Sequence, residues 1–200
     1  FVPPLEDYVP LFPALYGDYA LLMGRSTPSA VMEDPQLMAL CQGEQFLFGA
    51  QLGWMDDGIL RHPEAASYLR DLARLRSRVR GMLTGARMLR PPAVKCEPEI
   101  IEITLPGALC GRERDLILRR PPVRVTAWAD GNGGRLLLEL NEASAPARAE
   151  IALPENWGSG QARGWILGDP ATRGFASNGS LELELPPFGA AAVCDGEEAP

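Results

Sequence analysis

The 200-residue sequence is poor in the residue types that catalytic triads and membrane spans require. It contains a single histidine, His62, and a single lysine, Lys95. One histidine cannot serve a Ser-His-Asp triad when no serine stands in a nucleophile-elbow motif. No apolar run approaches the roughly 20 residues that a membrane-spanning helix needs. The sequence therefore predicts no membrane partner, and we expect His62, which precedes Pro63, to lie at the surface at the start of a helix.

The four cysteines do not show metal-binding spacing either. None belongs to a CxxC pair, so no zinc site is expected, nor any other metal ion or cofactor. Two of them are close enough in sequence to meet across a hairpin, but separate buried thiols are the favoured interpretation. The cysteines are Cys41, Cys96, Cys110 and Cys194.

Positive charge is scarce and unevenly placed. The formal net charge is −7, which argues against a nucleic-acid partner, because phosphate binding requires clustered cations. Arginines nevertheless crowd one stretch of thirty residues, either to contact an acidic partner or, as we favour, to form a solvated helix face. They are Arg61, Arg70, Arg74, Arg76, Arg78, Arg80, Arg87 and Arg90.

The composition changes near Pro91-Pro92, which predicts a boundary between a mostly helical part (residues 1–91) and a β-rich part (residues 92–200). In the first part we expect a helix from Glu33 to about Gln45, capped by Asp34. The apolar run 45–54 either continues that helix or forms a buried strand, since periodicity alone does not decide.

The clearest helix follows Pro63. Its apolar residues recur every three or four positions and predict one buried stripe, while Gly85 predicts the stop. Arginines at three positions occupy another face, which we expect to be turned to water. The apolar residues are Tyr68, Leu72, Leu75, Val79 and Met82, and the arginines are Arg70, Arg74 and Arg78.

The second part predicts an antiparallel β-sandwich of about seven short strands separated by turn signals. Residues 130–134 and Asn178-Gly179 are typical of hairpins, because Gly and Asn accept positive φ. Trp128 and Trp165 lie within strands and are expected in the core. The strands are predicted at 99–105, 123–128, 135–140, 149–153, 165–167, 180–185 and 190–193.

Three segments resemble, in this order, the closing part of bacterial TIM-barrel glycoside hydrolases: residues 9–25, 44–54 and 68–92. The resemblance implies a late barrel strand at 11–16 that ends in an aromatic residue and Asp18, a last strand within 44–54, and a closing helix. Residues 138–154 and 183–193 resemble elements of the small sandwich that follows. The implied fold is α/β plus all-β: the last βα units of a (β/α)8 barrel and then an antiparallel β-sandwich.

The same resemblance implies a hydrolase that acts on a carbohydrate substrate. About ninety residues hold only the last strands of a barrel, so the remainder of the parent enzyme, upstream of this chain, is the implied partner. Other catalytic carboxylates are then expected there. The alternative is a non-catalytic carbohydrate-binding or assembly module whose helical part docks onto another subunit.

Glycosidic bonds are usually hydrolysed by two carboxyl groups, which barrel enzymes hold at the carboxyl ends of strands. Asp18 follows the expected strand 11–16 and is the candidate catalytic residue, although capping of the next helix explains it equally well. Tyr16 and Tyr19 are candidates for stacking on a sugar ring, with core packing as the alternative for one of them.

Residues after the presumed last strand give the remaining candidates. Trp54, Asp56 and Asp57 are expected at the pocket rim, with a simple Asp-Asp-Gly turn as the competing interpretation. Gln51 becomes a candidate for binding a sugar hydroxyl if its segment is a strand. Glu44 stands in an otherwise apolar stretch, and we expect it at an exposed helix position.

Overall fold

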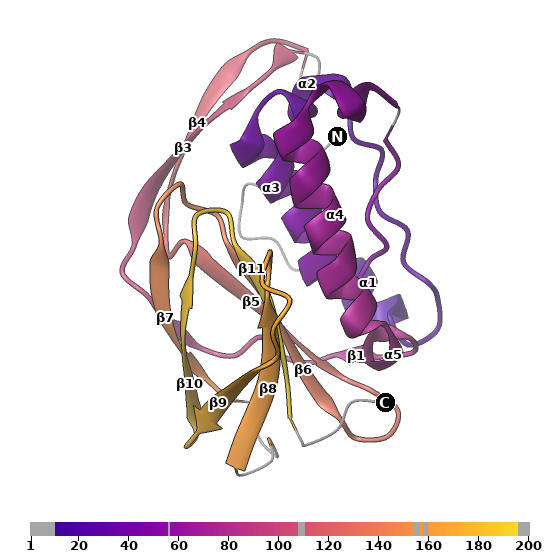
Figure 1. The fold of residues 1–200 in the computed structure, drawn as a ribbon, viewed down its shortest axis with the longest axis vertical. Helices are drawn as coiled ribbons and strands as arrows, with labels where there is room; N and C mark the ends of the chain where they lie inside the picture. Colours follow the sequence, from indigo (N-terminus) through magenta and orange to yellow (C-terminus); the bar gives the residue numbers. More distant parts are fainter. Residues whose placement is uncertain (1–10, 56, 108–110, 154–156, 158–159, 196–200) are drawn as a thin grey trace.

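A helical layer covers one face of a large β-sheet, and smaller sheets flank both (Figure 1). The computed structural model describes residues 11–55, 57–107, 111–153, 157 and 160–195. The helices all precede the long strands in sequence. They are α1 (Leu11–Tyr16), α2 (Ser29–Met32), α3 (Pro35–Leu47), the 3₁₀ helix η1 (Asp57–Arg61), α4 (Pro63–Arg78) and α5 (Arg80–Leu83).

Helix α3 begins as the sequence predicts. The Asp34 carboxylate accepts hydrogen bonds from the backbone N–H groups of Gln36 (2.8 Å) and Leu37 (3.2 Å), so it caps the first turn. The helix runs two residues beyond the expected end, to Leu47. Gly49 then adopts a φ of +65°, which glycine tolerates and which turns the chain out of the helix.

Helix α4 also confirms its prediction. Leu72 and Leu75 are buried in its apolar stripe, and Val79 follows them at the junction with α5. Gly85 has a φ of +70°, in agreement with the expected stop. Arg70, Arg74 and Arg78 are exposed.

The strand expected at residues 11–16 is wrong, because Leu11–Tyr16 is helix α1. Pro13 explains the difference: proline cannot donate in a ladder, but in the first turn of a helix its missing N–H has no partner to lose. The backbone N–H of Gly17 donates to the Pro13 carbonyl at 3.0 Å and closes the turn. Parallel pairing occurs instead further along the chain, between Met23 and Gln51.

All pairings between the named strands are antiparallel. The largest sheet has the order β1-β5-β6-β11-β8-β9, a second has β10-β7-β2, and β3 and β4 form a hairpin. The strands are β1 (Arg87–Met88), β2 (Val94–Lys95), β3 (Glu99–Leu105), β4 (Arg114–Arg120), β5 (Val123–Ala129), β6 (Arg135–Asn141), β7 (Ala147–Ala152), β8 (Gly160–Ile166), β9 (Arg173–Ser177), β10 (Ser180–Leu185) and β11 (Ala190–Cys194).

All seven expected strands are present, but four others were missed: β1, β2, β4 and β9. The hairpin predicted at 130–134 joins β5 to β6, and its Asp130 carboxylate accepts from the backbone N–H of Gly134 at 2.8 Å. The hairpin predicted at Asn178-Gly179 is wrong. This turn joins β9 to β10, and the two strands belong to different sheets. Turn chemistry predicts a reversal of the chain but not which strand the reversed segment will pair with.

Two apolar cores lie on opposite faces of the largest sheet. Leu136, Leu138 and Leu140 of β6 face the helices, while Leu137 faces the β10-β7-β2 sheet. Trp128 and Trp165, as expected, are buried in the core beneath the helices. A third core joins α2, α3 and α4 to the β3–β4 hairpin.

Glu139 places an acidic side chain at a fully buried position of the sheet. It points from β6 toward the second core, is fully buried, and neither carboxylate oxygen has a hydrogen-bond partner. Burial raises its pKa from an ordinary value of 4.5 to about 8. The carboxyl group is therefore protonated in the folded protein at neutral pH.

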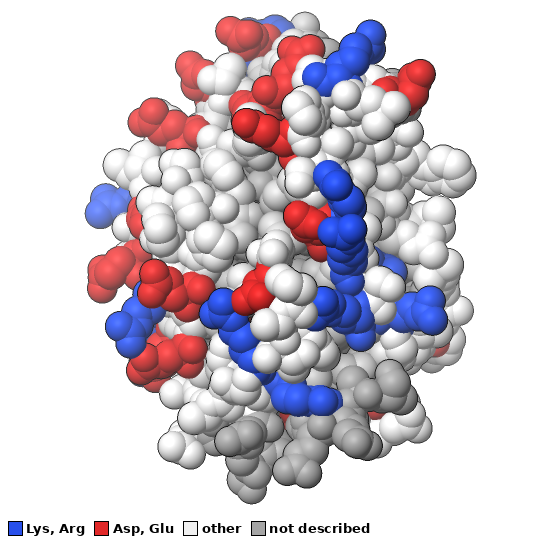
Figure 2. Space-filling model, viewed as in Figure 1, with Lys and Arg blue, Asp and Glu red and all other residues white. Residues whose placement is uncertain are grey.

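Charge is unevenly spread over the face that carries α4. Figure 2 shows Lys and Arg side chains in a line down the middle of this face, whereas Asp and Glu side chains gather toward its upper and left borders.

Candidate functional site

Two short chain segments run parallel to each other in the helical part. Met23 pairs with Gln51, and the backbone N–H of Gln51 donates to the Leu22 carbonyl at 2.8 Å. The pairing continues to the backbone N–H of Thr27, which donates to the Trp54 carbonyl at 2.9 Å. The segments touch so closely that a Cβ on Gly53 would lie 1.6 Å from the Arg25 carbonyl oxygen. Only glycine fits there.

A fully buried glutamine of α3 holds the ends of both segments. The Gln42 side-chain amide donates to the Thr27 hydroxyl, and its carbonyl oxygen accepts from the backbone N–H of Gly53 at 3.3 Å. Thr27 is also buried. The amide therefore fixes the register in which Trp54 leaves the parallel pair. This role could not be predicted from the sequence, since Gln42 has no local pattern that distinguishes it from other helical glutamines.

Two of the predicted site residues, Trp54 and Asp57, belong to the carboxyl end of this pair. Gln51 lies at its amino end, where it pairs with Met23, and is partly buried. Trp54 follows it with 70% of its surface exposed, and Asp57 is exposed at the start of η1. Asp56 lies outside the described residues. An exposed indole is suited to contact with the apolar face of a sugar ring.

The other three predicted residues lie at the opposite end. Tyr16 ends α1, and Tyr19 is 82% exposed. Asp18 and Tyr19 line a cavity of about 280 Å³ beside Arg76 and Thr84, at the C-terminal end of α4. Trp54 and Asp57 lie near the start of that helix, which is about 24 Å long at 1.5 Å per residue. The structure thus does not bring the predicted residues together in one site.

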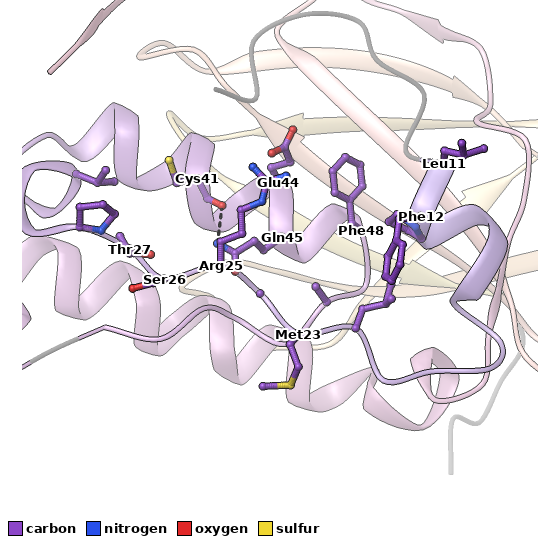
Figure 3. Close-up of a pocket in the computed structure, with 16 residues that line it drawn as sticks. Leu11, Phe12, Met23, Arg25, Ser26, Thr27, Cys41, Glu44, Gln45 and Phe48 are labelled. Carbon is purple, nitrogen blue, oxygen red and sulfur yellow. Dashed lines mark hydrogen bonds between the residues drawn. The ribbon is translucent and has the colours of Figure 1, made fainter. Parts of the chain in front are cut away.

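A larger cavity of about 400 Å³ lies between α1, α3 and residues 22–28. Figure 3 shows that Phe12 and Phe48 form one end of it, whereas Arg25, Glu44 and Gln45 lie toward the other. The Arg25 side chain forms part of the cavity wall, near Glu44 (Figure 3). The pocket combines an apolar end with a polar one, which is typical of sites for amphipathic small molecules.

The exposed position expected for Glu44 is wrong. Only 6% of its surface is exposed, and its carboxylate lies 3.7 Å from the Arg124 guanidinium of β5. Arg124 also pairs with Glu142 at 3.0 Å, and Glu142 pairs with Arg120 of β4 at 2.6 Å. The polar wall of the cavity is thus the end of a largely buried ion network that crosses from α3 to the sheets. Neutralisation by arginine explains why a carboxylate is tolerated in an apolar stretch.

Cys41 also lines this cavity, where its surroundings disfavour the thiolate form. Burial raises its pKa to about 12, and the nearby charge of Glu44 acts in the same direction, while Arg25 opposes them. The thiol is therefore protonated at neutral pH. Cys41, Cys96 and Cys194 are all free, and Cys110 lies outside the described residues.

Metal and membrane chemistry find no support in the described part of the chain. Among those residues, no group of three or more His, Cys, Asp or Glu side chains is placed to hold a metal ion. None of the helices seen there is both long and apolar enough to cross a bilayer.

Comparison with solved structures relates the fold to glycoside hydrolase domains. The chain is similar to a family 30 endoxylanase from Clostridium papyrosolvens, with 12% sequence identity and a TM-score of 0.51 over 94% of this chain and 45% of that one. It is also similar to a putative α-galactosidase from Bacteroides fragilis, with 12% identity and a TM-score of 0.47 over 82% of this chain and 29% of that one. The chain spans less than half the length of either protein.

Comparisons of the sequence itself gave no further relatives. No protein-family model matches the chain, and no curated protein matches it. The likeness therefore shows a glycosidase-related, β-rich fold, and the question of activity depends on the site.

Proposed function

We propose that this chain forms the closing part of a barrel-type glycoside hydrolase. The observation that carries the proposal is the parallel contact between Met23 and Gln51. The chain passes through α2 and α3 between these residues and continues into α4 after them, which is the strand–helix–strand–helix order of a βα barrel. The antiparallel sheets then form the accessory sandwich.

Exposed apolar side chains support this proposal. Of the eleven large hydrophobic residues exposed in the described part of the chain, nine fall between residues 11 and 60. Clustered exposure of this kind marks a surface that contacts another element. Preceding barrel strands and helices of the parent enzyme would cover most of it and leave Trp54 at the rim of the active site. The nine are Leu11, Phe12, Leu15, Tyr16, Tyr19, Leu21, Met23, Trp54 and Leu60.

We assign substrate binding to the carboxyl end of the parallel pair, because barrel enzymes have their active sites at the carboxyl ends of their strands. There, Trp54 offers an exposed ring for stacking on a sugar and Asp57 offers a carboxylate at the rim. Asp18 precedes the parallel segment at its amino end, so its catalytic role remains a separate prediction. The principal catalytic carboxylates are proposed to lie upstream of this chain.

Activity of a longer protein that includes the upstream region tests the proposal. Xylan and aryl xylosides are the first substrates, because the endoxylanase is the neighbour with the better structural match. We expect Trp54→Ala to raise KM by about tenfold, the loss of one stacking contact, and Glu184→Gln to leave KM unchanged. If Asp18→Asn lowers kcat by roughly a hundredfold, it acts in catalysis; an unchanged kcat assigns it to structure.

The 200-residue chain alone provides a second test. We expect it to bind a hydrophobic dye and to self-associate through the exposed apolar surface, and the longer protein to do neither. A monodisperse, dye-free chain that binds glycans without hydrolysing them would overturn the proposal in favour of a non-catalytic carbohydrate-binding module.

A further inference from the structure

Four arginines form a cationic stripe on the outer face of α4 and the adjacent strand β9. Arg70, Arg74 and Arg78 are exposed and recur every four residues, which places them on one side of the helix. Arg78 donates to the Pro170 carbonyl at 3.0 Å, so the helix face meets the β8–β9 turn, where Arg173 continues the stripe. Figure 2 shows this line of positive charge on a protein whose net charge is −7.

Two acidic residues lie beneath the stripe and orient it. Arg74 pairs with Asp71 at 3.2 Å, and Arg173 pairs with Asp169 at 2.6 Å. The arginine side chains are 70% and 52% exposed, whereas those of the aspartates are 29% and 26% exposed. The guanidinium groups are therefore more exposed to solvent than the carboxylates that pair with them.

A cavity of about 300 Å³ opens in the middle of the stripe. Its walls include Asp71, Arg74, Arg78, Trp165 and Asp169. The Arg78 guanidinium lies 6.0 Å from the Trp165 ring centroid, in cation–π range, and this contact holds its planar head over the cavity. The site thus combines fixed cations, hydroxyl-accepting carboxylates and apolar surface.

We propose that this stripe binds an acidic polysaccharide, one that carries carboxylate or sulfate groups on its sugar rings. Such a chain supplies anions for Arg74 and Arg78 and hydroxyl donors for Asp71 and Asp169, so it matches both charges of the cavity. A DNA backbone, by contrast, offers no hydroxyl donors for the two aspartates. The binding surface lies on the outside of α4 and does not require the proposed active site.

Binding of polygalacturonate to the longer protein that includes the upstream region, measured by calorimetry at low and at raised salt, tests the proposal. We expect the paired variant Arg74→Gln/Arg78→Gln to weaken binding by about tenfold or more, and binding by the unaltered chain to fall as salt rises. The control is Arg114→Gln/Arg119→Gln, which removes the same charge from exposed positions of the β3–β4 hairpin. It is expected to bind as the unaltered chain does.

Three outcomes would overturn the proposal: no binding of polygalacturonate, equal weakening in both paired variants, or DNA binding as tight as that of polygalacturonate. Neutral dextran is expected not to bind. Circular dichroism of each variant shows whether it has folded. Arg78→Lys keeps the charge, so its affinity for polygalacturonate shows whether the charge alone is sufficient for binding. This experiment measures binding and not hydrolysis, so absence of binding would leave the proposed glycosidase function intact. Absence of hydrolysis in the glycosidase assay would likewise leave the proposed binding of an acidic polysaccharide intact.

Discussion

The hydroxyl group of Thr126 on β5 donates a 2.6 Å hydrogen bond to the carbonyl oxygen of Leu47, the last residue of α3. The same hydroxyl accepts a 3.1 Å hydrogen bond from the indole Nε1 of Trp128. One buried side chain thus satisfies a carbonyl at a helix end and the only polar atom of the largest buried ring. It is a direct polar connection between the helical layer and the sheet.

Replacement of Thr126 by valine tests this connection. The methyl group keeps the volume, but the Leu47 carbonyl and the Trp128 indole N–H both lose their partner inside the core. We expect the free energy of unfolding to fall by roughly 2–4 kcal/mol, the cost of two unsatisfied buried groups. Denaturation in urea measures it. Thr126→Ser keeps the hydroxyl and should lose much less; an equal loss in both variants would assign the effect to packing.

The buried carboxyl of Glu139 predicts an unusual pH dependence. Its pKa in the folded protein, about 8, lies above the ordinary value of 4.5, so the folded state binds one proton more than the unfolded state between those values. The free energy of unfolding should therefore decrease by roughly 1 kcal/mol per pH unit as pH rises through that window. Below it, this stabilising contribution is fully present.

Urea denaturation at several pH values from about 5 to about 8 measures the slope, with two variants for comparison. Glu139→Leu removes the titrating group and should flatten this contribution while it stabilises the protein at the alkaline end. Glu184→Gln, at an exposed position of β10, should keep the slope of the unaltered chain. An unchanged slope in Glu139→Leu would show that another group causes it.

Gln42 is predicted to control the parallel pair locally. In Gln42→Leu, the Thr27 hydroxyl and the Gly53 backbone N–H lose their shared partner. We expect hydrogen exchange at the Gly53 amide to accelerate by about tenfold or more, and the free energy of unfolding to fall by roughly 1–3 kcal/mol. Gln36→Leu, a change on the first turn of the same helix, should leave that amide unaffected. Equal acceleration in both variants would refute the role of Gln42.

Patterns that depend on local chemistry could be predicted from the sequence. Asp34 and Gly85 mark helix limits through their own backbone preferences, and β10 alternates leucine with glutamate. The strand expected at 11–16 failed because its apolar content was weighed above Pro13. Strand β4 was missed because its arginines and aspartate obscure the alternation of Leu116 and Leu118.

The candidate site was harder to predict, because it depends on contacts between distant segments. Trp54 could be selected from the sequence as a residue that follows an apolar run. Gln42 could not, since its role arises only when residues 27 and 53 meet beside α3. The burial of Glu44 could not be predicted either, because it depends on Arg124, eighty positions further along the chain.

Both faces of the largest sheet are covered, because Leu136, Leu138 and Leu140 pack against the helices and Leu137 packs against the opposite sheet. Division of the chain at Pro91 would leave the largest sheet with one uncovered apolar face. It would also leave the helices without the surface against which they pack. The helices and the sheets therefore depend on each other for the burial of their apolar side chains.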